Sequence, residues 1–296
     1  MAKSILFEPV KSPYLVDFDG DFKIRKAATC PDEHDGKEAN KEALAAAVDK
    51  LNTLQNALYA NDRYSILLVF QALDAAGKDG TIRAVLTGVN PIGTQVFAYK
   101  SPNAEELDHD FMWRVYKNLP ERGRIGVWNR SHYEEVLVVR VHPEYLDAQK
   151  LPRGTDDLRA LWEERFESIN AFEKHWARNG GVILKFFLNV SQKEQHSRFL
   201  ERVQDRERNW KFSATDLAES EHWEDYMEAY QDVLRATSKP WAPWYCIPAD
   251  SKSFMRRTIA EIIVDTVAQL DLSPPKLTDD QRAALAEARA KLEAET

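Results

Sequence analysis

Cysteine is scarce in this chain of 296 residues, which contains only Cys30 and Cys246. Two isolated cysteines form neither a disulfide framework nor a zinc site, so we expect a reducing compartment. The first twenty residues lack the apolar core that a secretory signal requires, and no segment approaches the roughly 18 apolar residues of a membrane span. We therefore expect a cytoplasmic protein that does not enter a membrane.

Positive charge is also in deficit, because 40 Lys and Arg residues face 48 Asp and Glu residues and give a formal net charge of −8. This overall field repels phosphate and disfavours a general nucleic-acid-binding protein. Any anion site must therefore be built locally. Hydrophobic residues make up 44% of the chain, which is enough for a large core and excludes a wholly disordered polypeptide.

Five short apolar runs, rich in β-branched and aromatic residues, predict buried strands at 64–70, 95–99, 125–128, 182–190 and 244–247. Helical patterns lie between them at 79–89, 103–118, 131–141, 156–178 and 192–207. Strands that alternate with helices are typical of a parallel sheet covered on both faces. The predicted fold class is therefore α/β, a three-layer α/β/α domain with a parallel five-stranded sheet.

Composition divides the chain into three regions. Residues 1–60 combine an irregular segment with one helix, 61–270 form the α/β domain, and 271–296 form a charged helical tail with Thr278 as its N-cap. A polar and aromatic insertion at about 192–240 is interpreted either as a surface excursion or as a mobile lid over a site. The tail is expected to be peripheral or to contact another subunit.

The sharpest local feature follows the first predicted strand, where residues 71–83 read QALDAAGKDGTIR. A strand, a loop of small residues with Gly-Lys, and then a helix is the context that a phosphate-binding loop requires. Backbone N–H groups would point at the anion, and Lys78 would add a point charge. The match to G-x-x-x-x-G-K-[ST] is imperfect, because Ala72 replaces the first glycine and Asp79 replaces the hydroxyl residue that holds Mg²⁺.

The alternative to a phosphate-binding loop is a plain turn that uses glycine for its geometry. The residues expected around the phosphate are Ala75, Ala76, Gly77, Asp79, Gly80 and Thr81.

Asp74 lies inside this loop. A carboxylate among N–H groups that receive phosphate would be repulsive unless it holds Mg²⁺ or takes a proton from a nucleophile. We rank the metal role above the proton role, because a nucleotide phosphate is already largely ionised at pH 7. The structural alternative is that Asp74 caps the following helix.

The third predicted strand ends at Asn129 and Arg130, which would face the loop because ligands of such sheets bind at the carboxyl ends of strands. A guanidinium at this place can neutralise phosphate oxygens with a bidentate fork. Ser131 and Glu134 also fit a helix capping box. Both interpretations are compatible, since Glu134 in a first turn would still line the pocket.

Arg198, Arg202 and Arg206 follow one another at helical spacing and would share one helix face. The pattern fits a track for a polyanion, or a solvated face whose charges are paired with neighbouring acids. The further candidates for phosphate contact, each weak on its own, are Lys100, Arg114, Arg122, Arg124 and Lys185.

Together these segments resemble the polyphosphate kinase 2 family, the polyphosphate:nucleotide phosphotransferases, over about 44–267. The strings that carry the resemblance are LDAAGKDGTIRAV, SPNAEELDHDFMWRVYKNLPERGRIGVWNRSHYEEVLVVRVHPEYL, KFFLNVSQKEQHSRFLERV, NWKFSATDLAE and KPWAPWYCIPADSKSF.

This resemblance implies a thymidylate-kinase-like P-loop fold with a helical lid, and a dimer or tetramer of identical subunits. It implies transfer of a terminal phosphoryl group between inorganic polyphosphate and AMP or ADP, with Mg²⁺ or alternatively Mn²⁺. Asp74 and Lys78 fall on the family's Walker A aspartate and lysine, and Arg130 falls on its Walker B arginine. Arg198 and Arg202 fall in the lid region that contacts phosphate.

One segment departs from the commoner family pattern. Many members have Asp-Arg-Ser-x-Tyr-Asn-Arg where this chain has Asn129-Arg-Ser-His-Tyr-Glu134-Glu135. The variant resembles the subgroup that phosphorylates both nucleoside mono- and diphosphates. A neutral Asn129 would hold Mg²⁺ less strongly than Asp, so metal binding would depend more on Asp74 and the substrate phosphates. Glu134 is the candidate for favouring the shorter nucleotide.

No Ser/His/Asp or Cys/His arrangement suggests a covalent intermediate, so we expect direct in-line transfer that depends on positioning and charge stabilisation. Two alternatives remain at this level. One is an ATP-dependent nucleoside monophosphate kinase on the same fold. The other is a non-catalytic regulator that binds nucleotide or polyphosphate.

Overall fold

Five parallel strands form one sheet in the computed structural model, which describes residues 6–31, 35–152, 157–207, 209–211 and 213–295. The strands are β1 (Ser65–Gln71), β2 (Thr94–Ala98), β3 (Ile125–Asn129), β4 (Gly181–Asn189) and β5 (Trp244–Pro248). Their order in the sheet is β2-β3-β1-β4-β5. All five strands predicted from apolar runs are confirmed, and no bound is shifted by more than one residue.

The central strand β1 explains why both faces of the sheet are covered. All seven of its residues are buried. Ile66, Leu68 and Phe70 face one core cluster, whereas Leu67 and Val69 face the other. A strand that is apolar on both faces is stable only between two layers of helices.

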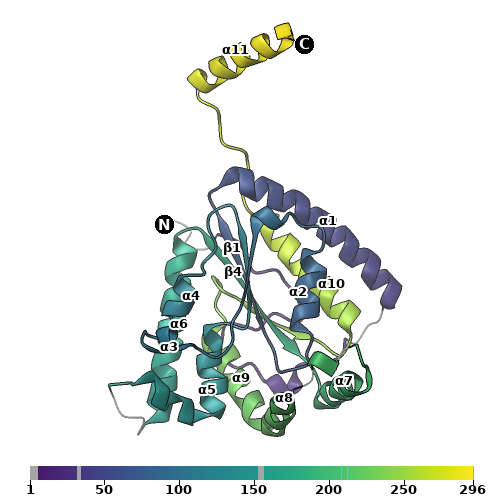
Figure 1. Ribbon diagram of the computed structural model, residues 1–296, viewed down its shortest axis with the longest axis vertical. Coiled ribbons are helices and arrows are strands. Elements are labelled where there is room, and N and C mark those ends of the chain that lie inside the picture. Colours follow the sequence, from purple (N-terminus) through teal and green to yellow (C-terminus); the bar gives the residue numbers. More distant parts are fainter. Residues whose placement is uncertain (1–5, 32–34, 153–156, 208, 212, 296) are drawn as a thin grey trace.

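The helical layers lie on opposite faces of the sheet (Figure 1). On one face pack α1 (Lys37–Asn61), α2 (Lys78–Leu86) and α10 (Lys252–Val267). On the other face pack α4 (Trp113–Tyr116), α6 (Leu158–Arg178) and α9 (Trp223–Thr237). The structure therefore has the three-layer α/β/α architecture that the sequence predicts.

Two predicted helices are broken into shorter pieces. The pattern at 103–118 forms α3 (Ala104–Leu107) and α4, because the Asp110 carboxylate accepts a hydrogen bond from the Met112 N–H and closes a local turn between them. The pattern at 131–141 forms a 3₁₀ turn, η3 (His132–Val136), followed by α5 (Val138–Val141). The remaining 3₁₀ turns are η1 (Ile24–Lys26), η2 (Pro91–Gly93), η4 (Pro143–Gln149), η5 (Asn209–Lys211) and η6 (Ser220–His222).

The N-terminal region is part of the body rather than a separate unit. Leu15 forms an antiparallel bridge with Tyr245 of β5, and the Val16 N–H donates to the Trp244 carbonyl at 2.9 Å. This pairing covers an edge strand that would otherwise expose its backbone. Leu51 and Leu58 of α1 are fully buried in the core.

The expected lid at 192–240 is not one separable piece. Its last helix, α9, buries Tyr230, Val233 and Leu234 in the core, so α9 belongs to the body. The earlier helices α7 (Gln192–Gln204) and α8 (Ala214–Glu219) lie at the carboxyl edge of the sheet (Figure 1). A mobile lid can therefore comprise at most the part that precedes α9.

The charged tail forms α11 (Asp279–Glu295), which projects away from the body and has no buried residue (Figure 1). The predicted N-cap is confirmed, because the Thr278 hydroxyl accepts from the Gln281 N–H and the Gln281 side chain accepts from the Thr278 N–H. In the described part of the chain, no helix combines the length and apolarity that crossing a bilayer would require.

Candidate active site

The loop between β1 and α2 lies at the centre of the carboxyl edge of the sheet. β1 pairs with β3 on one side and with β4 on the other, so this loop occupies the switch point where ligands bind in open α/β sheets. A cleft of about 600 Å³ opens there. The predicted site residues that line it are Asp74, Ala75, Gly77, Lys78, Asp79, Gly80, Lys100, Asn129, Arg130 and Arg202.

The loop backbone has the form of an anion-binding concavity. Ala75 (φ +59°) and Gly77 (φ +105°) both adopt left-handed conformations, which alternate with ordinary ones and turn successive N–H groups toward one point. A left-handed alanine costs on the order of 1 kcal/mol, and such strain concentrates at functional sites. Gly77 is the N-cap of α2 and provides no side-chain cap, so the first N–H groups of α2 can serve an anion.

Lys78 is folded back into its own loop. Its ammonium donates to the carbonyls of Ala72 at 2.7 Å and Leu73 at 3.2 Å. Burial lowers the pKa of Lys78 to about 8, the charge of Arg130 acts in the same direction, and Asp74 partly compensates. Two neutral carbonyls are weak partners for an ammonium, so a phosphate entering the cleft would offer Lys78 a stronger one.

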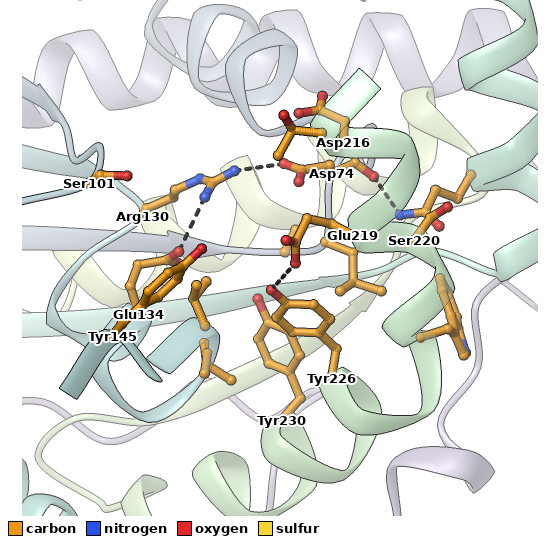
Figure 2. A pocket seen from close by; sticks show the side chains of 17 residues that line it. Asp74, Ser101, Arg130, Glu134, Tyr145, Asp216, Glu219, Ser220, Tyr226 and Tyr230 are labelled. Atoms are coloured by element: carbon orange, nitrogen blue, oxygen red, sulfur yellow. Dashed lines mark hydrogen bonds and ion pairs between the residues drawn. The ribbon is translucent and has the colours of Figure 1, made fainter. Parts of the chain in front are cut away.

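Arg130 joins the loop to the turn after β3. Its guanidinium donates to the Asp74 carboxylate at 2.7 Å and to the Glu134 carboxylate at 3.2 Å (Figure 2). Arg130 itself has a left-handed backbone (φ +64°), and its N–H donates to the carbonyl of Phe70 on β1. The two carboxylates, Glu134 foremost, raise the pKa of Arg130 against the opposing effect of burial. The site therefore holds a permanent positive charge between two acids.

The structure separates two helix-capping predictions. Ser131 caps η3 as expected, since its hydroxyl accepts from the Tyr133 N–H. The reciprocal half of the capping box is wrong, because the Glu134 carboxylate binds Arg130 instead. Asp74 does not cap α2, which begins after Gly77, and its carboxylate is taken by Arg130.

A second contact across the cleft was not predicted from the sequence. The Asn129 amide donates to the Asp79 carboxylate at 2.8 Å and so connects the end of β3 to the first turn of α2. An aspartate at position 129 would place two carboxylates against each other without a bound cation. The unusual Asn129 and the unusual Asp79 therefore form a matched pair.

Two of the cations expected to contact phosphate face the cleft. Lys100 is exposed at its rim. Arg202 also lines it and pairs with Asp216 at 3.3 Å. Thr81 and Ala76 are buried beneath the loop, so of these two residues only backbone groups remain as phosphate contacts.

The other expected cations have structural contacts instead. The Arg114 side chain is 11% exposed; it pairs with Glu106, donates to the Lys100 carbonyl at 2.8 Å and lies over the Tyr99 ring. Lys185 is fully buried and donates to Glu173 at 2.6 Å. Arg198 is buried behind the loop, among backbone carbonyls. The expectation of one basic face is wrong, because α7 ends at Gln204 before Arg206 and its Arg198 faces inward.

Two pockets that the sequence did not predict adjoin Arg130. One has a volume of about 200 Å³ and is bordered by Glu134, Tyr226 and Tyr230, with the Tyr226 hydroxyl donating to Glu219 at 2.6 Å (Figure 2). The other has a volume of about 320 Å³ and a more apolar lining that includes Tyr99 and Val138. The only signal in the sequence is the aromatic spacing in 223–230, which by itself indicates a buried helix face.

The protein provides only part of the ligand set that a divalent cation would need. Among the described residues, no group of three or more His, Cys, Asp or Glu side chains is arranged to hold a metal. Asp74, Asp79 and Asp216 nevertheless bring hard oxygen ligands to one cleft. Burial and the charge of Asp74 raise the pKa of Asp216. A cation bound between these carboxylates would relieve the repulsion between them. This donor set fits Mg²⁺, which takes one or two carboxylates and completes its coordination with substrate phosphates and water.

A nest of N–H groups between a buried strand and a helix, a lysine folded into it and an arginine from the adjacent strand define a P-loop phosphotransferase. A family model, Polyphosphate kinase 2 (PPK2), matches residues 34–274. The chain belongs to the polyphosphate kinase 2 family and is a polyphosphate-dependent nucleotide kinase.

Similar proteins support this assignment. The chain is 49% identical over 259 residues to the ADP-polyphosphate phosphotransferase of Rhodopseudomonas palustris, over 88% of this chain and 90% of that protein. It is 40% identical over 267 residues to the AMP/ADP-polyphosphate phosphotransferase of Meiothermus ruber, over 89% and 95% respectively. The crystal structure of polyphosphate kinase 2 from Arthrobacter aurescens TC1 matches with a TM-score of 0.80 and 33% identity, over 94% of this chain and 100% of that one.

Proposed function

We propose that this chain transfers the terminal phosphoryl group of polyphosphate to both AMP and ADP, reversibly, by direct in-line attack with Mg²⁺ or alternatively Mn²⁺. The observation that carries the proposal is the position of Arg130. It borders the phosphate-loop cleft and both adjoining pockets, and it is fixed there by Asp74 and Glu134. A phosphoryl group that passes between donor and acceptor would have to pass this guanidinium.

The donor would enter on the side of the phosphate loop. Lys78, Lys100 and Arg202 line that cleft. Arg256 of α10 adds positive charge beside the cleft. Its guanidinium packs against Gly80, with Nη2 2.9 Å from the position that a Cβ on residue 80 would occupy. Its buried Nε has no hydrogen-bond partner in the described part of the chain. Burial lowers the pKa of Arg256, and the neighbouring Arg83 and Arg198 add to the effect. Such a local excess of cations in an acidic chain favours a polyanionic donor.

The acceptor would bind on the other side of Arg130. The pocket of about 320 Å³ provides an aromatic and apolar lining for a nucleobase through Tyr99, Val138 and Tyr145. Arg130 and Glu134 lie on the same lining, so the acceptor phosphate would meet the guanidinium. Aromatic side chains at such a pocket bind the face of a base by stacking.

The chemistry requires no protein nucleophile. The terminal oxygen of a nucleotide phosphate is already largely ionised near pH 7 and can attack directly. Lys78, Arg130 and the loop N–H groups would stabilise the charge on the transferring group, and Asp74 would orient Arg130 and provide a metal ligand. Bound Mg²⁺ would supply charge neutralisation on the phosphate oxygens.

The range of acceptors would depend on Asn129 and Glu134. Among the similar proteins, one is named for ADP and the other for AMP and ADP, so the family likeness alone leaves the acceptor open. A carboxylate at 134, held at the rim of the acceptor pocket by Arg130, would disfavour the extra phosphate of ADP relative to AMP. The neutral amide of Asn129 donates a hydrogen bond to Asp79, so the Asp79 carboxylate would keep a partner even when no cation is bound.

The test is to incubate the purified protein with Mg²⁺, long-chain polyphosphate and either AMP or ADP, and to follow products by chromatography. ATP that appears from AMP through ADP supports the proposal, and Glu134→Gln should shift the ratio of initial rates toward ADP. Product from ADP alone would contradict the proposed roles of Asn129 and Glu134.

We also propose that the active form is a cytoplasmic dimer or tetramer of identical subunits, as the family resemblance implies. Light scattering of the purified full chain tests the subunit number.

A further inference from the structure

The guanidinium of Arg198 is fully engaged by the protein. Arg198 lies on α7, is 4% exposed, and donates through Nη1 to the carbonyls of Ala75 at 3.1 Å and Ala76 at 2.8 Å. Through Nη2 it donates to the carbonyls of Ala249 at 2.6 Å and Asp250 at 3.3 Å. Its Nε donates to Glu194 at 2.8 Å. A guanidinium has five N–H donors, and these five contacts leave none for a phosphate oxygen.

A neighbouring side chain of α7 extends the same contact. Gln195 is also buried, and its amide donates to the Asp74 carbonyl at 3.0 Å. Three consecutive loop carbonyls, those of Asp74, Ala75 and Ala76, are therefore held by two residues of one helix. The N-cap of α7 is Ser191, whose N–H donates to the Asp250 carboxylate at 2.8 Å.

The held carbonyls determine where the loop N–H groups point. In a trans peptide the C=O and the N–H of the same unit point in opposite directions. The Ala76 carbonyl points at Arg198, so the Gly77 N–H of the same unit points away from α7. The preceding unit, between Ala75 and Ala76, is oriented likewise, and its N–H makes only a long contact of 3.4 Å to the Leu73 carbonyl.

We infer that Arg198 is a positioning residue: with Gln195 it fixes the phosphate loop in its anion-binding form and couples that form to α7, and it does not bind the polymer. The inference rests on the proposed function, because it assigns how the donor site is kept in order. α7 continues to Arg202 and leads to the short helix α8, both at the cleft. A displacement of this segment would pull on the loop through Arg198, so lid position and loop order would change together.

The decisive comparison uses a conservative variant. Arg198→Lys keeps the charge but cannot bridge carbonyls of two separate loops. We expect Arg198→Lys to lower kcat by on the order of 100-fold, the size of effect that misplaced reacting groups produce. The dependence of the polyphosphate KM on salt should stay as in the natural protein. In the control Arg202→Gln, which removes a cation that faces the cleft, KM should rise and its salt dependence should weaken.

A result near the natural kcat for Arg198→Lys would overturn the inference, as would a weakened salt dependence in Arg198→Met like that of Arg202→Gln. Gln195→Met serves as a milder second variant if Arg198→Lys proves unstable on thermal unfolding. It should lower kcat without altering the salt dependence, and a kcat equal to that of the natural protein would count against the coupling.

Hydrogen exchange separates this inference from the proposed function. In the protein without substrate, amide exchange at residues 74–80 should become faster in Arg198→Lys and in Gln195→Met. Exchange in the strands β1 and β4 should stay unchanged. Unchanged exchange in the loop would refute the positioning role. Faster exchange together with an absence of transfer by the natural protein would leave the positioning role intact and refute the proposed function.

Discussion

The ammonium of Lys78 lies between the carbonyls of Ala72 and Leu73, inside the loop that would receive phosphate. We predict that Lys78→Ala lowers kcat/KM by on the order of 100- to 1,000-fold, or about 3 kcal/mol, the cost of losing a donor to a developing anion. Steady-state kinetics with polyphosphate and ADP provides the measurement. Lys50→Ala, on the exposed face of α1, is the control and should be unchanged. Near-normal turnover in Lys78→Ala would contradict the assignment of the loop.

The lowered pKa of Lys78 predicts a pH profile. The free enzyme should lose the proton of Lys78 as the pH rises through about 8, and the neutral amine no longer attracts phosphate. We therefore expect kcat/KM for polyphosphate to fall above pH 8, whereas kcat should fall only at higher pH, because a bound polyanion holds the proton on.

The control for this profile is Lys78→Arg, whose guanidinium stays charged. Its kcat/KM should be lower overall but should not fall between pH 8 and 9. A natural profile that stays flat up to pH 9.5 would show that the protonation of Lys78 does not limit donor binding.

At the scale of elements, β4 and α6 are joined by a buried charge pair. The Lys185 ammonium on β4 donates to Glu173 of α6 at 2.6 Å, to the Tyr133 hydroxyl and to the Thr237 carbonyl. Burial raises the pKa of Glu173 while Lys185 opposes that effect, and burial lowers the pKa of Lys185. Removing one partner leaves an uncompensated charge in the core.

We predict that Lys185→Met lowers the free energy of unfolding by about 3–5 kcal/mol, measured by urea denaturation. The double variant Lys185→Met/Glu173→Leu should recover part of that loss, because neither charge then remains buried. A double variant that is less stable than the single one would show that the pair contributes more than mutual neutralisation.

The same elements show what the sequence can predict and where it fails. The strands were predictable because a run such as SILLVFQ is buried on both faces, and burial on both faces requires no knowledge of the partners. The phosphate loop was predictable because its residues are contiguous. The partners of Asp74, Asn129 and Arg198 come from other strands and helices, and no local pattern gives them.

Charged residues in particular were misassigned by pattern. Helical spacing places Arg198 and Arg202 near each other on α7, yet one is buried among carbonyls and the other faces the cleft. Lys185 was a candidate for phosphate contact and is a fully buried member of the core. Which charges face solvent depends on how the layers pack, and packing is not contained in the periodicity of one segment.

At the scale of the whole molecule, α11 stands apart from the three-layer body (Figure 1). We predict that removing residues 275–296 leaves kcat, both KM values and the unfolding midpoint of the body unchanged, since no residue of α11 is buried. A helix of 17 residues that buries none of its side chains is only marginally stable in water. On truncation, circular dichroism should therefore show at most the loss of helix that α11 itself accounts for, and no further loss from the body.

Light scattering of the full and shortened chains completes this test. An equal subunit number would confirm the peripheral role, and a change in kinetics on truncation would contradict it. A smaller assembly with unchanged kinetics would identify α11 as a contact between subunits.

The central claim is that the loop, Lys78 and Arg130 serve a polyphosphate donor. The most direct measurement compares initial rates of ADP formation from AMP with Mg²⁺ and either long-chain polyphosphate or ATP as donor, at equal concentrations of terminal phosphoryl groups. We predict fast transfer from polyphosphate. From ATP we predict only a slow rate, by reversal: ATP passes its terminal phosphoryl group to traces of polyphosphate, leaving ADP, and that polyphosphate then phosphorylates AMP. ATP acting as the faster donor, with polyphosphate inert, would contradict the account.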